Sequence, residues 1–283
     1  MNRRTFLGAA VAAPLAAQIH RRAGTHVKIG LNAYSFNRPL TAGTMKLPEV
    51  IDYCAAHDID GVDLTGYYFP GYPVVATDDY LYGLKRQAWL NGVTITGTGV
   101  RNDFASADAA ARKQHIQMVK EWTDVARKLG ASVIRVFTGP KMAEGHTFDQ
   151  VLEWMIPAFK ECAEYGRERG VIIGLQHHND FLKTADETIR VVKAVNSDWF
   201  SVILDVGSLR QGDPYEEIAR LLPYACTWQI KETVWYGAKE TPIDLPRLKG
   251  IIEKAGYRGF LPVESLAPGD PTAFIEKVKK VML

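Results

Sequence analysis

The stretch VIIGLQ (residues 171–176) is a short run of mostly β-branched apolar residues, and the polar sequence HHND (177–180) follows it directly. Buried parallel strands are typically this short and this rich in valine and isoleucine. Similar runs recur along the chain, with amphipathic segments between them. Eight strand–helix pairs at roughly even spacing predict an α/β fold, a single-domain (β/α)8 TIM barrel, with a doubly wound open sheet as the alternative. The predicted strands begin near Val27, Asp60, Val93, Ser132, Val171, Phe200, Ala225 and Phe260.

The segments between these strands have helical patterns and helical end signals. Thr184, with Glu187 three residues later, predicts a capping box at the start of one helix. Gly130 and Gly170 each follow a helical segment, at the position where a left-handed residue commonly ends a helix. The predicted helices cover residues 47–57, 79–91, 107–129, 147–169, 184–195, 214–222, 244–255 and 271–281.

The first seventeen residues differ in character from the rest of the chain. Paired arginines in MNRRTFLG (1–8) precede an alanine-rich apolar run. This pattern predicts a twin-arginine export signal over residues 1–17, followed by the barrel over residues 27–283. The apolar run is too short to cross a bilayer core of about 30 Å as a helix. We therefore expect a periplasmic or otherwise exported protein; an uncleaved tether and a plain basic N-terminal arm are the alternatives.

The composition is that of a globular protein, with 47% hydrophobic and 23% charged residues in a chain of 283. The 34 basic residues include Arg3 and Arg4, so the chain beyond residue 17 balances its 32 acidic residues. A neutral chain does not favour nucleic acid or an anionic membrane as a partner. Three cysteines leave at least one unpaired, and we expect Cys54, Cys162 and Cys226 to be small core residues.

Polar and charged residues gather at the carboxyl ends of the predicted strands. In a (β/α)8 barrel this end carries the active site. Buried polar groups are costly unless they are paired or bind a ligand, so their convergence on one face predicts a functional site. The residues at or near these ends are Asn32, Asp63, Arg101, Arg135, Gln176, Asp205, Gln229, Lys231 and Glu264.

Asp205 and Glu264 end two of the predicted strands, where their carboxylates are the hard oxygen ligands that a divalent ion prefers. Glu264 is also the candidate general base, since a carboxylate there can remove a proton beside a carbonyl group. Lys231 shares a strand face with Gln229. Its alternative roles are an ion pair with either carboxylate at the barrel top and polarisation of a substrate carbonyl. A lysine beside a metal ion would have a lowered pKa.

His177 and His178 are adjacent, and alternate residues of an extended chain face opposite sides. Gln176 and His178 should then share one side, so we expect one of the two histidines to face the pocket as a catalytic candidate. The alternative is that both histidines cap the loop. The candidates for substrate contacts are the polar and aromatic residues near the strand ends: Asn32, Tyr34, Arg101, Arg135, Asn179 and Trp235.

With these residues in place, the chain resembles the xylose isomerase-like TIM-barrel superfamily, also described as the sugar phosphate isomerase/epimerase family. The markers of the resemblance are GLNAYSF (30–36), GVDL (61–64), LDVGS (204–208), QIKE (229–232) and VE (263–264). The epimerases of this group hold one divalent ion with Glu, Asp, His and Glu. The resemblance therefore implies a site for Mn²⁺, Zn²⁺ or Mg²⁺ formed by Gln176, Asp205, Gln229 and Glu264.

Two of these four positions differ from the family pattern, because Gln176 replaces a carboxylate and Gln229 replaces an imidazole. A glutamine oxygen can ligate a metal, but Gln176 cannot act as a base, so epimerisation by two bases would need His177 or His178. The glutamine pattern resembles an exported subgroup that includes lyases and hydratases of 3-keto-glycosides. The resemblance implies a metal-assisted carbohydrate-active enzyme that forms an enolate from a keto-sugar. A sugar or keto-glycoside is the expected partner, homo-oligomerisation is left open, and a non-catalytic sugar-binding barrel is the alternative.

Overall fold

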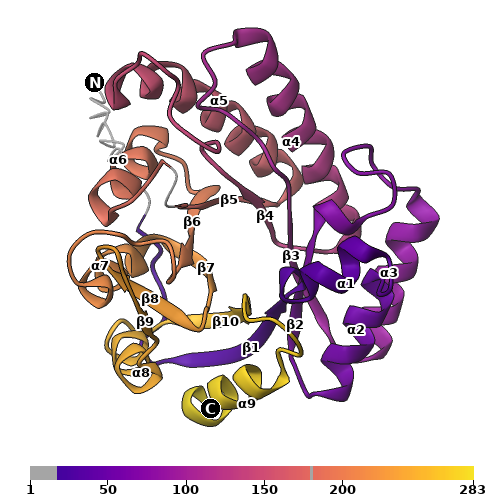
Figure 1. Ribbon diagram of the computed structural model, residues 1–283. Helices are drawn as coiled ribbons and strands as arrows, with labels where there is room; N and C mark the ends of the chain where they lie inside the picture. Colours follow the sequence, from indigo (N-terminus) through magenta and orange to yellow (C-terminus); the bar gives the residue numbers. More distant parts are fainter. Residues whose placement is uncertain (1–17, 179–180) are drawn as a thin grey trace, which may run out of the picture.

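The structure, a computed structural model, describes residues 18–178 and 181–283. Eight parallel strands form a ring at its centre, and helices surround the ring on the outside (Figure 1). This is the predicted (β/α)8 TIM barrel. The predicted export signal at residues 1–17 and the predicted substrate contact Asn179 lie outside the described residues, so both stay predictions.

The strands follow one another around the ring in chain order, and each starts within two residues of its predicted position. Their short, β-branched sequences suit a layer that is covered on both faces. The barrel strands are β1 (His26–Asn32), β2 (Gly61–Thr65), β3 (Thr94–Gly99), β4 (Val133–Val136), β5 (Ile172–Gln176), β6 (Phe200–Asp205), β7 (Ala225–Gln229) and β10 (Arg258–Val263).

The ring closes between β7 and β10, immediately beyond the last residue of β7. Ile230 pairs with Val263 in a parallel bridge. The Ile230 N–H donates to the Pro262 carbonyl oxygen at 2.8 Å, and the Glu264 N–H donates to the Ile230 carbonyl oxygen at 2.8 Å. Because Lys231 and Glu264 directly follow the paired residues, closure of the barrel brings these two side chains to the same place.

Each of the predicted helices is present. The capping box forms as expected: the Glu187 N–H donates to Thr184 Oγ1 at 3.2 Å, and the Thr184 N–H donates to a Glu187 carboxylate oxygen at 3.1 Å. Gly130 and Gly170 end their helices with φ of 79° and 69°. The predicted helices are α2 (Leu47–Ala56), α3 (Asp78–Leu90), α4 (Ala109–Leu129), α5 (Phe148–Arg169), α6 (Ala185–Val195), α7 (Pro214–Leu221), α8 (Leu245–Lys254) and α9 (Thr272–Met282).

Two short features were not predicted from the sequence. The six-residue α1 (Asn37–Ala42) follows the 3-10 turn η1 (Ala33–Phe36), and it is too short for a helical period to show in the pattern. An antiparallel hairpin of β8 (Thr233–Tyr236) and β9 (Lys239–Pro242) lies between β7 and α8. Its strands are four residues each, and Gly237, with φ of 63°, forms its tight turn.

The three cysteines are free; Cys54 and Cys162 are buried, as expected, and Cys226 is half-buried. Within residues 18–178 and 181–283, no helix combines the length and apolar character needed to cross a membrane.

The packing of α5 against the barrel gives a test of the fold. A Cβ atom on Gly166 of α5 would lie 2.5 Å from the Val171 carbonyl oxygen and 3.1 Å from Ile173 Cδ1. We expect Gly166→Ala to lower the free energy of unfolding in urea by about 1–3 kcal/mol through overpacking. The control, Gly83→Ala, lies on the exposed face of α3 with no atom within 4 Å of its Cβ. It should instead raise that free energy by up to about 1 kcal/mol. Equal stability of the two variants would contradict this packing.

Candidate active site

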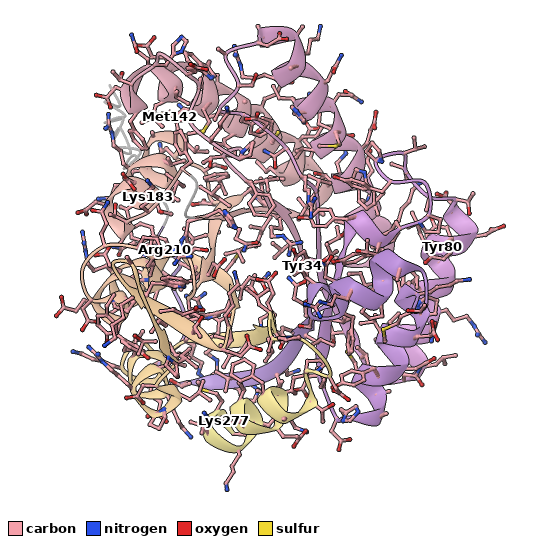
Figure 2. All side chains as sticks on the ribbon, viewed as in Figure 1. Tyr34, Tyr80, Met142, Lys183, Arg210 and Lys277 are labelled. Carbon is pink, nitrogen blue, oxygen red and sulfur yellow. The ribbon has the colours of Figure 1, made fainter. Side chains whose placement is uncertain are left out.

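A cavity of about 580 Å³ opens at the carboxyl end of the barrel. Its walls come from the ends of the strands and the loops that follow them, which is where the sequence predicts a site. Figure 2 shows one wall residue, Tyr34, near the middle of the ring, whereas Tyr80 and Lys277 lie at the outside of the molecule. The lining residues are Tyr34, Tyr67, Arg101, Asn102, Asp103, Arg135, Phe137, Gly139, Pro140, Gln176, His178, Lys231, Glu264 and Leu266.

Asp205, the last residue of β6, is fully buried and accepts hydrogen bonds from four donors. Its Oδ1 accepts the Gly207 N–H at 3.0 Å. Its Oδ2 accepts from Gln176 Nε2 at 2.7 Å, from Ser208 Oγ at 2.8 Å and from Lys231 Nζ at 2.7 Å. Burial by itself raises the pKa of Asp205, but the charge of Lys231, the neighbouring His177 and the hydrogen bonds from Lys231 and Gln176 together outweigh burial and lower the pKa to about 2. This carboxylate is therefore ionised and hydrogen-bonded on both oxygens.

Lys231 joins Asp205 to Glu264. Its Nζ lies 2.7 Å from Asp205 Oδ2 and 3.1 Å from Glu264 Oε2, and the lysine side chain is almost fully buried. Burial by itself lowers the pKa of Lys231, but the charge of Asp205 and then that of Glu264 outweigh it and raise the pKa above its ordinary value. Lys231 is therefore a charged ammonium group between two carboxylates, and the lowered pKa expected beside a metal ion stays a prediction.

The two histidines lie on opposite sides, as the strand alternation predicts. His178 lines the cavity together with Gln176, and its ring packs edge-on against Phe137 with centroids 6.0 Å apart. His177 is fully buried and is absent from the cavity wall; its Nε2 accepts the backbone N–H of Asp205 at 3.0 Å. Burial lowers the pKa of His177 to about 4, so its imidazole is neutral near pH 7. This position suits His177 to holding β5 and β6 in register and not to contacting a substrate.

The two predicted glutamine ligands keep buried polar atoms without a hydrogen-bond partner. Gln229, at the end of β7, has neither its Oε1 nor its Nε2 bonded within the described part of the chain. Gln176 uses its Nε2 on Asp205 and leaves Oε1 unpartnered. Unsatisfied buried groups are unusual and often mark a place where a ligand or water binds.

Two arginines line the cavity, and they differ in burial and in their partners. Arg135 on β4 is buried, and its Nη1 donates to Asp63 Oδ2 at 3.0 Å while its Nη2 donates to Thr65 Oγ1 at 3.3 Å. Burial by itself lowers the pKa of Arg135, but Asp63 raises it above its ordinary value. Arg101 is exposed, and its guanidinium lies over the Tyr67 ring, 4.3 Å from the centroid. Arg135 is thus a fixed part of the wall, and Arg101 is a rim residue.

Of the other described residues predicted to contact a substrate, one lines the cavity and two do not. Tyr34, in η1, lines the cavity. Asn32 is buried behind it, where its Oδ1 accepts the Tyr34 N–H at 2.8 Å and Thr65 Oγ1 at 2.9 Å. Trp235 is in the β8–β9 hairpin, where its ring packs 3.6 Å from the Arg210 guanidinium carbon, and it is not part of the cavity wall. The hairpin, which was not predicted, is the reason for this displacement.

Several wall residues were not selected from the sequence. Asn102 and Asp103 follow β3 directly after Arg101, and Phe137 follows β4, so the rule that selected Arg101 would also have selected them. Gly139, Pro140 and Leu266 come from loops without a comparable signal.

The four predicted metal ligands do not fit a divalent ion in this arrangement. Both oxygens of Asp205 already accept hydrogen bonds, and the ammonium of Lys231 lies between the two carboxylates. A second cation there would meet strong repulsion at these distances. Among residues 18–178 and 181–283, no group of three or more His, Cys, Asp or Glu side chains is placed to hold a metal.

Comparisons with known proteins agree with the fold. The family model described as "Xylose isomerase-like TIM barrel" matches residues 51–281. No curated protein matches the sequence. Among solved structures, D-psicose 3-epimerase with D-tagatose from Clostridium cellulolyticum H10 is 19% identical, with a TM-score of 0.70 over 90% of this chain and 91% of that chain.

Two further solved structures are also similar to this chain. The IOLI protein with a bound zinc atom is 17% identical, with a TM-score of 0.71 over 90% of this chain and 96% of that chain. The probable 3-DHS dehydratase AsbF from Bacillus anthracis is 16% identical, with a TM-score of 0.68 over 90% of this chain and 98% of that chain. At these identities the likeness shows a shared fold.

The buried, neutral His177 predicts how stability depends on pH. Its pKa is about 4 in the folded protein against an ordinary value of 6.5, so the unfolded chain binds the proton more readily. Its contribution is fully present above pH 6.5 and is lost as the pH falls towards 4, by an amount on the order of 3 kcal/mol. The His177→Gln variant keeps an acceptor for the Asp205 N–H but does not titrate, so urea denaturation should show a shallower loss of stability between pH 6.5 and 4. The same pH dependence in both proteins would contradict the assignment.

Proposed function

The chain belongs to the xylose isomerase-like TIM barrel family, and we propose that it is a carbohydrate-active enzyme that forms an enolate from a keto-sugar. One observation carries the proposal. Glu264 and Lys231 both line the cavity, and their charged atoms are 3.1 Å apart. A carboxylate base beside a fixed cation is the pair of groups that deprotonation next to a ketone needs.

Glu264 is the proposed base. Its carboxylate takes a proton from the carbon next to the ketone, the electrons of that C–H bond form a C=C bond, and the carbonyl π electrons move to the oxygen. Lys231 has three N–H donors, and its two carboxylate partners account for two of them. The third is available to the enolate oxygen that forms in the cavity, where a preorganised donor stabilises developing charge.

The fate of the enolate depends on the second proton carrier. Gln176 lines the cavity at the position where a second base is expected, and an amide cannot carry out that step. His178 also lines the cavity and is the proposed second group. With one carboxylate base, we favour elimination. The enolate oxygen electrons re-form the carbonyl, the enolate C=C electrons form a double bond between the α- and β-carbons, and the bond from the β-carbon to its oxygen substituent breaks while His178 protonates that oxygen. Isomerisation, in which His178 returns a proton to carbon, is the alternative outcome.

An adjoining groove supports a substrate larger than one sugar ring. This groove of about 650 Å³ lies beside the cavity, and Tyr34 and Leu266 line both. It offers room for a glycosidic substituent, which is the group that elimination from a 3-keto-glycoside would expel. Aromatic faces such as that of Tyr34 commonly contact apolar surfaces of ligands.

The location of the protein is a separate proposal. The paired arginines and apolar run at residues 1–17 support export by the twin-arginine route. An exported enzyme would meet unphosphorylated sugars, which agrees with a keto-glycoside as the substrate.

Deuterium exchange tests the proposed base. Keto-sugars and 3-keto-glycosides incubated with the protein in heavy water should gain deuterium at the carbon beside the ketone or release the glycosidic group. Glu264→Gln keeps the shape and a hydrogen-bond acceptor for Lys231 but removes the base, so the rate should fall by about a hundredfold or more. Glu253→Gln makes the same chemical change on an exposed face of α8 and should leave the rate unchanged.

A non-catalytic sugar-binding function would give a different experimental result. A non-catalytic sugar-binding barrel would bind the keto-sugar in a calorimeter, and neither exchange nor release would occur in the unmodified protein. That result would reject the enzymatic proposal and leave the binding function.

A further inference from the structure

We infer that the ammonium of Lys231 takes the place of the divalent ion in this chain, so that the site carries its own fixed cation. The catalytic part of this inference rests on the proposed function, because it assigns the cation the task of stabilising an enolate. The cation site itself is a property of the folded chain and is argued from its contacts alone.

The position of Lys231 is the first argument. Of the four residues predicted to hold an ion, only Asp205 and Glu264 carry a charge. Lys231 Nζ lies within hydrogen-bonding distance of both, at 2.7 Å and 3.1 Å. The lysine therefore lies between the only two anionic ligands that the predicted metal site retains.

The charge of the site is the second argument. A divalent ion is normally held by several anionic oxygens or by imidazoles. Here Gln176 and Gln229 are neutral amides, and His177 is buried behind Asp205. Two carboxylates with one ammonium leave a net charge of −1, whereas the same carboxylates with both Lys231 and a divalent ion would leave a buried excess of positive charge. The two carboxylates alone would balance a divalent ion, so it is the ammonium of Lys231 between them, and not the pair of glutamines, that argues against one.

The backbone around the lysine is the third argument. A Cβ atom on Gly207, two residues after Asp205, would lie 2.8 Å from Lys231 Cδ. The loop after β6 therefore leaves space that the lysine side chain fills. On the other side, the Ile230–Val263 bridge fixes Lys231 next to Glu264. The lysine is held in this place by the barrel closure and by a glycine, and not by its ion pairs alone.

Manganese binding to substitution variants tests the inference without any substrate. Mn²⁺ titrations of the full chain, followed by electron paramagnetic resonance, should show no site in the unmodified protein up to millimolar ion. In Lys231→Ala, Asp205 and Glu264 lose their cation, so we expect at least a tenfold gain in Mn²⁺ affinity. The control Lys231→Ala/Glu264→Gln removes one carboxylate and should lose most of that gain.

Thermal unfolding gives a second measurement. Removing Lys231 leaves two buried carboxylates without a cation, so Lys231→Ala should melt at a lower temperature than the unmodified protein, and Mn²⁺ should raise its melting temperature selectively. If this variant fails to fold, Lys231→Gln, which keeps hydrogen-bond donors to both carboxylates, is titrated in its place and should show the same gain.

Two results would overturn the inference. Stoichiometric Mn²⁺ or Zn²⁺ binding by the unmodified protein, lost in Glu264→Ala, would show that an ion displaces the lysine. Absence of binding in the unmodified protein and in every folded Lys231 variant would show that the lysine does not occupy a cation site. Neither result depends on turnover, so failure of this inference is distinct from failure of the deuterium exchange test.

Discussion

The interaction on which the site depends is the contact of one buried ammonium, on Lys231, with two buried carboxylates, on Asp205 and Glu264. Each charge would be costly in this interior without the others. The three residues come from three different strand ends. Asp205 lies near Lys231 because β6 pairs with β7, and Glu264 lies near Lys231 because β7 and β10 close the barrel at Ile230 and Val263. Closure of the barrel therefore completes the site. A register shift there would separate the charges as well as open the ring.

Some polar groups of the barrel interior hold the strands together, and others are suited to act on a ligand in the cavity. Arg135 pairs with Asp63 and Thr65 in the wall, and His177 is neutral and bonded to the backbone of β6. These contacts hold the strands in place, although Arg135 Nε and His177 Nδ1 have no hydrogen-bond partner among the described residues. Glu264, Lys231 and His178 line the cavity and have acid–base or electrostatic capacity, and Arg101 and Asp103 line it as well. The division follows from burial and partners, since both sets have similar side chains.

The family shares a barrel, and the ends of its strands decide the chemistry. Here the likeness in fold to sugar epimerases extends over about nine-tenths of the chain at identities below 20%. At two of the four expected ligand positions the side chains are neutral amides, and a lysine lies between the carboxylates that remain. In the proposed mechanism the lysine has the task that a bound ion can have, because both stabilise negative charge on a substrate oxygen.

The sequence by itself determined the order of strands and helices, the capping box at Thr184 and the end of the barrel at which the polar residues converge. These features can be predicted from short stretches of sequence. They depend on the spacing of apolar residues, on the residues that begin and end helices, and on the rule that parallel strands have their carboxyl ends at one edge of the sheet. The placement of Gln176 and His178 on one side of the strand and His177 on the other also follows from a local rule. The sequence left open which histidine faces the cavity. The hairpin that removes Trp235 from the cavity, and the contact of Lys231 with two carboxylates, were decided only by the tertiary structure. Strands that are distant in the chain create those contacts, so no short-range pattern records whether a carboxylate meets a metal ion or a lysine.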